Sequence, residues 1–229
     1  MSGSEFAGFS HNLIAFLAGL KANNERAWFE ARKGDYETLF KEPARDFVAA
    51  MSGRLGEIAE GLTAEPKIGG SIHRINRDTR FSKDKTPYNT HLHFVFWRGA
   101  KPAGSSGFHF VISPTDVGAG VGNWAFGPDQ LTRFRAAVAD PAKGAVLAEA
   151  IKIGMAGPGM ILDPPALKRV PAGFDAEAPH ADLLKHKGIV VRGDGAIPDA
   201  LFGLGAVDLA LALFRPLIPV HDWLMTHAS

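Results

Sequence analysis

The chain concentrates positive charge in one short segment, residues 74–85, which reads RINRDTRFSKDK. Five cationic side chains lie here against two acidic ones, whereas the 229-residue sequence as a whole carries 25 Lys and Arg against 24 Asp and Glu. The Arg guanidinium is a planar fork that matches phosphate or carboxylate oxygens, and Lys adds a compact charge. The segment therefore predicts an anion-binding site. Its predicted residues are Arg74, Arg77, Asp78, Arg80, Lys83, Lys85 and Tyr88.

The spacing of these cations sets a condition on the backbone. Side chains alternate between the two faces of a strand, so Arg74 and Arg80 would face one side while Arg77 and Lys83 face the other. All four reach one ligand only if the chain bends after Asp78. Thr, Ser and Pro residues in the following stretch favour such a loop.

Asp78 and Tyr88 complete the predicted site. The Tyr88 hydroxyl would donate to a ligand or orient a guanidinium. An Asp beside several Arg side chains stays ionised and is a weak base, so we expect Asp78 to fix Arg heads rather than accept a proton. The pattern identifies no catalytic residue. In an enzyme, these cations would stabilise negative charge on the substrate.

Two other interpretations of the segment stay open. As a nucleic-acid-binding module it would contact phosphates while Phe81 or Trp97 stacks on a base, although the formal net charge of +1 weighs against this. Alternatively, Asp78 and Asp84 pair with the bases, and the segment is an internal ion-pair network of a structural or interaction protein.

Four histidines are of a residue type that could bind a metal. His91 and His93 share one face of a predicted strand, and His73 or His109 on adjoining strands would have to complete a site. Spacing alone is weak evidence where acidic residues are sparse, and we predict no metal.

The glycine-rich stretch before Asn123 predicts no cofactor. Asn123 stands where the dinucleotide-binding pattern requires its third glycine. Gly118, Gly120 and Gly122 instead form a flat strip that a ring, another backbone or a ligand can approach closely.

Composition indicates a cytoplasmic protein with no membrane partner. A sequence that is 46% hydrophobic can bury a sizeable core, and the absence of cysteine excludes disulfides, thiolate metal sites and a Cys nucleophile. The N-terminus lacks the basic and apolar regions of a secretory signal. The most apolar stretch, residues 206–220, is too short to span a bilayer. The sequence does not specify an oligomeric state.

Periodicity predicts an α+β fold, with N-terminal helices packed on a mainly antiparallel sheet and with C-terminal helices. We expect one domain over residues 1–229, made of a helical layer (1–62), a sheet (66–126), and helices plus a short strand (127–229). Asn24 is the expected N-cap of the second helix. The first strand is expected from Ile72, where residues begin to alternate between the two faces. Residues 206–214 are the last long helix expected, because Pro216 and Pro219 break the apolar stretch that follows.

Two stretches resemble a known family. Residues 17–29, LAGLKANNERAWF, are followed by residues 77–88, RDTRFSKDKTPY. Similar later motifs lie at residues 122–124, 131–135 and 171–187. The chain thus resembles, over nearly its whole length, a bacterial and fungal family of conserved hypothetical proteins, classed as a domain of unknown function, with the motif Arg-x-x-Arg-Asp-x-Arg-Phe-Ser-x-Asp-Lys-x-Pro-Tyr. The resemblance implies a single soluble domain and no particular reaction. Where a Lys usually follows the Tyr, this chain has Asn89.

Overall fold

The N-terminal segment is helical because its apolar residues recur at helical spacing. In the computed structural model, which describes residues 6–99 and 106–229, Leu13, Leu17 and Leu20 are fully buried along one helix face. Ser10 caps that helix by accepting a hydrogen bond from the backbone N–H of Leu13. The helical segments are α1 (His11–Ala22), α2 (Arg26–Glu30), α3 (Lys33–Asp35), η1 (Tyr36–Lys41), α4 (Glu42–Ser52), η2 (Leu55–Glu57), α5 (Pro128–Ala139), α6 (Pro141–Gly154), η3 (Ala181–Lys185), η4 (Asp199–Phe202), α7 (Ala206–Phe214), η5 (Arg215–Leu217) and α8 (Ile218–His227).

A six-stranded antiparallel sheet lies in the order β1-β2-β3-β4-β6-β5. The strands are β1 (Leu62–Thr63), β2 (Leu92–Arg98), β3 (Gly107–Ile112), β4 (Asp116–Asn123), β5 (Ile161–Leu162) and β6 (Ile189–Ala196). β5 pairs with β6 so that Ile161 stands opposite Arg192. This register brings the residues after β5 beside the middle of β6.

Two glycines of β4 allow β6 to approach closely. A Cβ on Gly122, whose φ is +136°, would stand 1.9 Å from the carbonyl oxygen of Ile189, and a Cβ on Gly120 would stand 2.8 Å from the Cβ of Arg192. Another backbone therefore occupies the flat strip that the sequence predicts at these two glycines.

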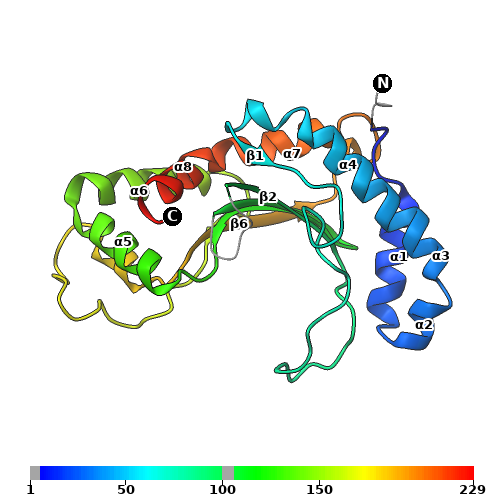
Figure 1. Cartoon of the computed structure of the whole chain (residues 1–229), viewed down its shortest axis with the longest axis horizontal. Helices are drawn as coiled ribbons and strands as arrows, with labels where there is room; N and C mark the ends of the chain where they lie inside the picture. The colour runs from blue at the N-terminus through cyan, green and yellow to red at the C-terminus, as the bar shows by residue number, and fades with distance from the viewer. Residues whose placement is uncertain (1–5, 100–105) are drawn as a thin grey trace. The chain divides into compact units, whose positions relative to one another are not determined.

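Contacts divide the chain into two compact units, and the first comprises Met1–Phe96, His109–Gly118 and Gly195–Leu211. Its core contains an aromatic cluster around the fully buried Phe47 of α4. The Phe47 ring lies 4.8 Å from that of Phe94 in β2 and 5.6 Å from that of Phe110 in β3. Helix α4 is thereby tied to both strands. Figure 1 shows α1 to α4 following one another in the blue part of the chain.

The second unit comprises Trp97–Phe108, Ala119–Asp194 and Ala212–Ser229. Trp223 of α8 donates its indole N–H to the carbonyl oxygen of Lys143 in α6 (2.9 Å), and its ring meets that of Phe134 in α5 edge-on. These contacts join α5, α6 and α8. In the described parts of the chain, no helix combines the length and apolar character needed to cross a membrane.

The predicted α+β fold is confirmed, but two element predictions are wrong. The strand expected from Ile72 is instead a loop that carries isolated bridges, among them Ile72 with Phe94 and Asn76 with Tyr88. Helix α8 begins at Ile218, beyond the last helix predicted, because a proline such as Pro219 commonly interrupts a helix. Proline instead occupies the first turn of α8, where its missing N–H leaves no helical hydrogen bond unmade.

Phe47→Ala should lower the free energy of unfolding by about 3–5 kcal/mol in urea titrations, because it leaves a cavity among packed rings. Phe81→Ala is the matched control, since Phe81 is 94% exposed. We expect the control to change stability by less than about 0.5 kcal/mol. Equal losses in the two variants would contradict the assignment of the core.

Candidate functional site

The predicted anion-binding residues lie in the first unit, on the long loop between β1 and β2. The chain does bend there, as the anion-site hypothesis requires. The antiparallel bridge between Asn76 and Tyr88 closes the root of the loop, where the Arg77 N–H donates to the carbonyl oxygen of Pro87 (2.9 Å). Residues 74–88 are called the basic loop below. In Figure 1 this teal segment projects away from the sheet.

Asn24 anchors the root of the basic loop to the helical segment. Its Nδ2 donates to the carbonyl oxygen of Tyr88 (2.8 Å), and its Oδ1 accepts from the Tyr88 N–H (3.1 Å). The N-cap predicted at Asn24 is therefore wrong: Glu25 occupies that position and makes no side-chain capping bond. An amide side chain satisfies both backbone groups of Tyr88 at once, so Asn24 acts as a clamp.

The Tyr88 ring is buried rather than displayed on the basic loop. It is 5% exposed and stacks on Phe29 of α2 with 4.2 Å between ring centroids. Burial raises the pKa of its hydroxyl, and the charges of Glu30 and Arg26 also act on it. Tyr88 thus positions the loop through its backbone and its ring.

Both acidic residues of the basic loop pair with arginines of the same loop. Asp84 accepts from Nη1 of Arg77 at 2.7 Å, and Arg77 also donates to the backbone carbonyl of Thr86 at 2.9 Å and to its hydroxyl. Asp78 accepts from Nε (3.0 Å) and Nη2 (2.8 Å) of Arg80. These bidentate and bridging bonds brace the loop internally.

The same hydrogen bonds keep the two carboxylates ionised. The pKa of Asp78 is lowered by hydrogen bonds from the side chain and backbone of Arg80. The pKa of Asp84 is lowered by the N–H and hydroxyl of Thr86, with Arg77 adding to the effect. Neither group is suited to take up a proton near neutral pH, in line with the orienting role expected of Asp78.

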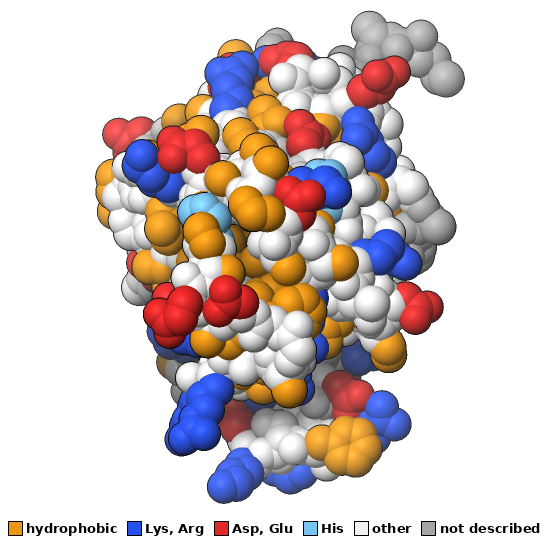
Figure 2. All heavy atoms as spheres, turned by 90° about the vertical axis from the view of Figure 1, so that its left-hand side faces the viewer, with side chains coloured by type: hydrophobic (Ala, Val, Ile, Leu, Met, Phe, Trp, Pro, Cys, Tyr) orange, Lys and Arg blue, Asp and Glu red, His pale blue; other side chains and the backbone are white. Residues whose placement is uncertain are grey.

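The other cations of the basic loop differ in their surroundings. Lys85 donates from Nζ to the carbonyl oxygen of Thr79 (2.9 Å). Arg74 and Lys83 are exposed and belong to none of the ion pairs found among the described residues. Figure 2 shows Lys and Arg side chains projecting at the lower end of the molecule.

Phe81 lies among these charges with almost no burial. Its side chain is 94% exposed, and the guanidinium carbon of Arg80 lies 5.7 Å from the centre of its ring. An exposed aromatic ring beside cations offers a stacking surface as well as charge.

Four histidines gather in the first unit. His73 stacks on His93 with 4.0 Å between ring centroids, Nε2 of His93 lies 2.9 Å from Nδ1 of His109, and the His91 ring centre is 6.0 Å from that of His93. Burial lowers the pKa of His93 to about 2 and that of His109 to about 4, with neighbouring histidines adding to both shifts. The rings are therefore neutral at pH 7. Across residues 6–99 and 106–229, no group of three or more His, Asp or Glu has the geometry of a metal site.

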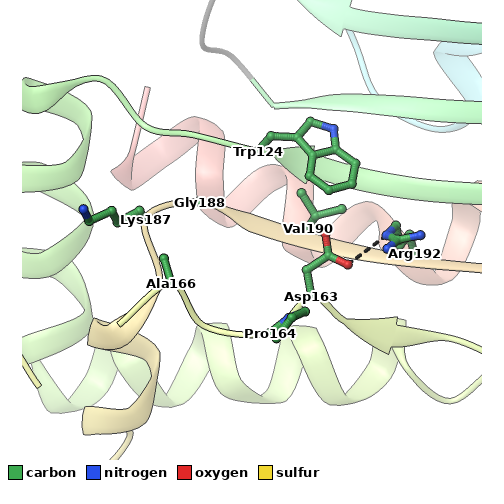
Figure 3. Close-up of a pocket in the computed structure, with 8 residues that line it drawn as sticks. All are labelled: Trp124, Asp163, Pro164, Ala166, Lys187, Gly188, Val190 and Arg192. Atoms are coloured by element: carbon green, nitrogen blue, oxygen red, sulfur yellow. Dashed lines mark hydrogen bonds and ion pairs between the residues drawn. The ribbon is translucent and has the colours of Figure 1, made fainter. Parts of the chain in front are cut away.

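A pocket of about 360 Å³ lies in the second unit, where sequence reasoning placed no site. Trp124 forms one wall, and Asp163 and Arg192 form another (Figure 3). Asp163 and Arg192 are 29 positions apart and come together only through the pairing of β5 with β6. No local pattern in the sequence marks this pocket, because its two walls come from segments far apart in the chain.

The chain matches the family model described as "Conserved hypothetical protein (DUF2461)" over residues 12–223. It belongs to this family. The resemblance to conserved hypothetical proteins of unknown function is thereby confirmed. No curated protein and no solved structure matches the chain. The DUF2461 match spans the basic loop, the four histidines and the pocket at Trp124, but it assigns no activity to any of them.

Asn24→Ala should lower the free energy of unfolding by about 1–3 kcal/mol, because it leaves both backbone groups of Tyr88 without their partner. It should also speed tryptic cleavage at the Arg and Lys residues of the basic loop. Both quantities can be measured by urea titration and by timed proteolysis of the native protein. Asn12→Ala, at an exposed position of α1, is the control and should match wild type. A normal cleavage rate in Asn24→Ala would contradict the clamp.

Acidification should destabilise the fold between pH 6.5 and 4. The folded-state pKa values of His93 and His109 lie below the unfolded value of 6.5, so the unfolded chain binds protons first as the pH is lowered. The free energy of unfolding therefore decreases as the pH falls. At pH 5 each ring accounts for about 2 kcal/mol, from about 1.4 kcal/mol per pH unit. His93→Gln should flatten the pH profile of the unfolding free energy, whereas His11→Gln, at an exposed position, should not. If the unfolding free energies of His93→Gln and wild type changed equally with pH, the pH dependence could not be assigned to His93.

Proposed function

We propose that this DUF2461 protein binds a small phosphorylated or carboxylated ligand through the basic loop. The proposal rests on one observation: both acidic residues of the loop, Asp78 and Asp84, form ion pairs with arginines of the same loop, Arg80 and Arg77. The remaining charged side chains of the loop, Arg74, Lys83 and Lys85, are all positive. Because the cysteine-free sequence requires no oxidising compartment, we place this activity in the cytoplasm.

The ion pairs and the remaining cations have different roles in this proposal. Arg77 and Arg80 stiffen the loop, while Arg74 and Lys83 provide charge for a ligand. A stiff loop loses less conformational freedom on binding, which favours affinity. If the protein is an enzyme, these cations stabilise negative charge on the substrate, because the depressed pKa values of Asp78 and Asp84 make both poor bases.

A second candidate ligand is single-stranded nucleic acid, and the exposure of Phe81 favours it. A base stacked on an aromatic side chain contributes about 1–3 kcal/mol, and nearby cations would contact phosphates. Binding of this kind weakens steeply as salt is raised. A small anion held by one or two cations shows a smaller salt dependence.

The third interpretation, an internal ion-pair network, already accounts for two of the loop's arginines. It would account for the whole basic loop if Arg74 and Lys83 had no ligand. The test must therefore change Arg74 and Lys83, which are proposed to bind the ligand, separately from the arginines of the ion pairs, Arg77 and Arg80.

Thermal shifts with phosphate, sulfate, nucleotides, sugar phosphates and short oligonucleotides test the proposal. At a hundred times its Kd, a ligand stabilises by about 2.7 kcal/mol, which corresponds to a Tm increase of about 5–10 °C for a chain of this size. We expect one ligand class to give this shift in wild type. The double variant Arg74→Ala, Lys83→Ala should keep the ligand-free Tm and lose the shift.

Arg77→Ala is the matched comparison, because removing a brace should speed tryptic cleavage within the basic loop while changing the ligand-free Tm only slightly. Phe81→Ala should abolish a shift caused by oligonucleotides and spare one caused by phosphate. The proposal fails if no anion shifts the Tm of wild type, or if the double variant responds as wild type does. The ion-pair network would then be the better account of the basic loop.

A further inference from the structure

The pocket at Trp124 has the chemistry of a binding site that is independent of the basic loop. Trp124 is 62% exposed, whereas Trp97 and Trp223 are buried at 2% and 4% exposure. Leaving a large indole in water forgoes the free energy that its burial would provide. The exposed indole lies beside the hollow, so its free face is available to a ligand there.

The backbone around Trp124 is held in place although its ring is exposed. Gly188 lies so close that a Cβ there would stand 2.4 Å from the carbonyl oxygens of both Asn123 and Trp124. The Phe126 N–H donates to the carbonyl oxygen of Lys187 at 2.7 Å, and the Ala125 N–H donates to the Asn123 side chain. The indole is thus presented from a fixed backbone, which reduces the entropic cost of stacking a ligand on it.

A fixed polar pair stands beside the ring. Nε of Arg192 donates to Oδ1 of Asp163 at 2.8 Å, and the Arg192 guanidinium carbon lies 5.5 Å from the centre of the Trp124 ring. The Asp163 N–H donates to the carbonyl oxygen of Val190 at 2.9 Å. The Asp163 side chain is 16% exposed, and that of Arg192 is 47% exposed. One wall therefore offers a carboxylate that accepts hydrogen bonds and a guanidinium that donates them.

Figure 3 shows how these groups surround the hollow. The Trp124 ring lies above Val190, the Asp163–Arg192 pair lies at one end, and Lys187 extends from the other. The side chains that line the space between are small, and the volume of about 360 Å³ is at the small end for ligand pockets. A ligand that fits must be compact and must cover a ring on one face while meeting both a donor and an acceptor at its edge.

We propose that the Trp124 pocket binds a neutral saccharide unit. A pyranose has a face of C–H groups that packs on an aromatic ring, and hydroxyls around its edge that both donate and accept. Neighbouring hydroxyls match the Asp163–Arg192 pair in either orientation. A hydrocarbon ring would cover Asp163 without a hydrogen bond. Because Lys187 and Arg192 also line the pocket, the test includes anionic competitors.

Saturation-transfer NMR on the full chain tests this site. The probes are methyl glycosides of glucose, galactose, mannose and N-acetylglucosamine, with maltose, cellobiose, AMP and benzoate. We expect at least one saccharide to bind wild type and to protect tryptophan fluorescence from acrylamide, because Trp124 is the most exposed of the four tryptophans.

Variants assign the binding to the pocket. Trp124→Ala and Asp163→Asn should each weaken saccharide binding by about tenfold or more. Val146→Ala, which removes another exposed apolar side chain of the same unit, should bind normally. The loop variant Arg74→Ala, Lys83→Ala should also bind normally, which separates this site from the proposed function. Binding of AMP or benzoate in place of sugars, binding that survives Trp124→Ala, or no saccharide binding at tens of millimolar would each overturn the proposal.

Discussion

The alternation of side chains along β2 and β3 is the constraint on which the first unit depends. Burial of Phe47 against Phe94 and Phe110 fixes which face of these strands points into the core. Residues of the opposite parity must then lie on the other face, and these include His93 and His109. The histidine cluster is therefore a consequence of core packing, and desolvation keeps its rings neutral.

The basic loop shows how a charge-rich segment is stabilised without a core of its own. The clamp at Asn24 and the stacking of Tyr88 on Phe29 fix its root. Beyond the root, exposed ion pairs individually contribute little, so their effect lies in limiting the conformations of the loop rather than in adding much to the stability of the whole protein. The cations outside these ion pairs are the ones that remain available to a ligand.

The sequence predicted what depends on local pattern and missed what depends on contacts between distant residues. Helix α1 and the β2 to β4 strands follow from apolar periodicity, and the charge excess and bend of the basic loop follow from composition and turn residues. Asn24 was assigned to its own helix because its partner Tyr88 is 64 positions away. The pocket at Trp124 was missed for the same reason, since its wall forms only when β5 pairs with β6. The burial of the Tyr88 ring likewise depends on α2, which no local pattern places beside it.

The closure of the basic loop separates its local stability from that of the core. The bridge between Asn76 and Tyr88 holds the two ends of the segment together at the root. None of residues 77–87 is buried, so the tip contributes nothing to the core of the unit. Opening of the tip would therefore leave the root and the core intact, and the protection of its amide hydrogens reports the bracing ion pairs rather than the global stability of the protein.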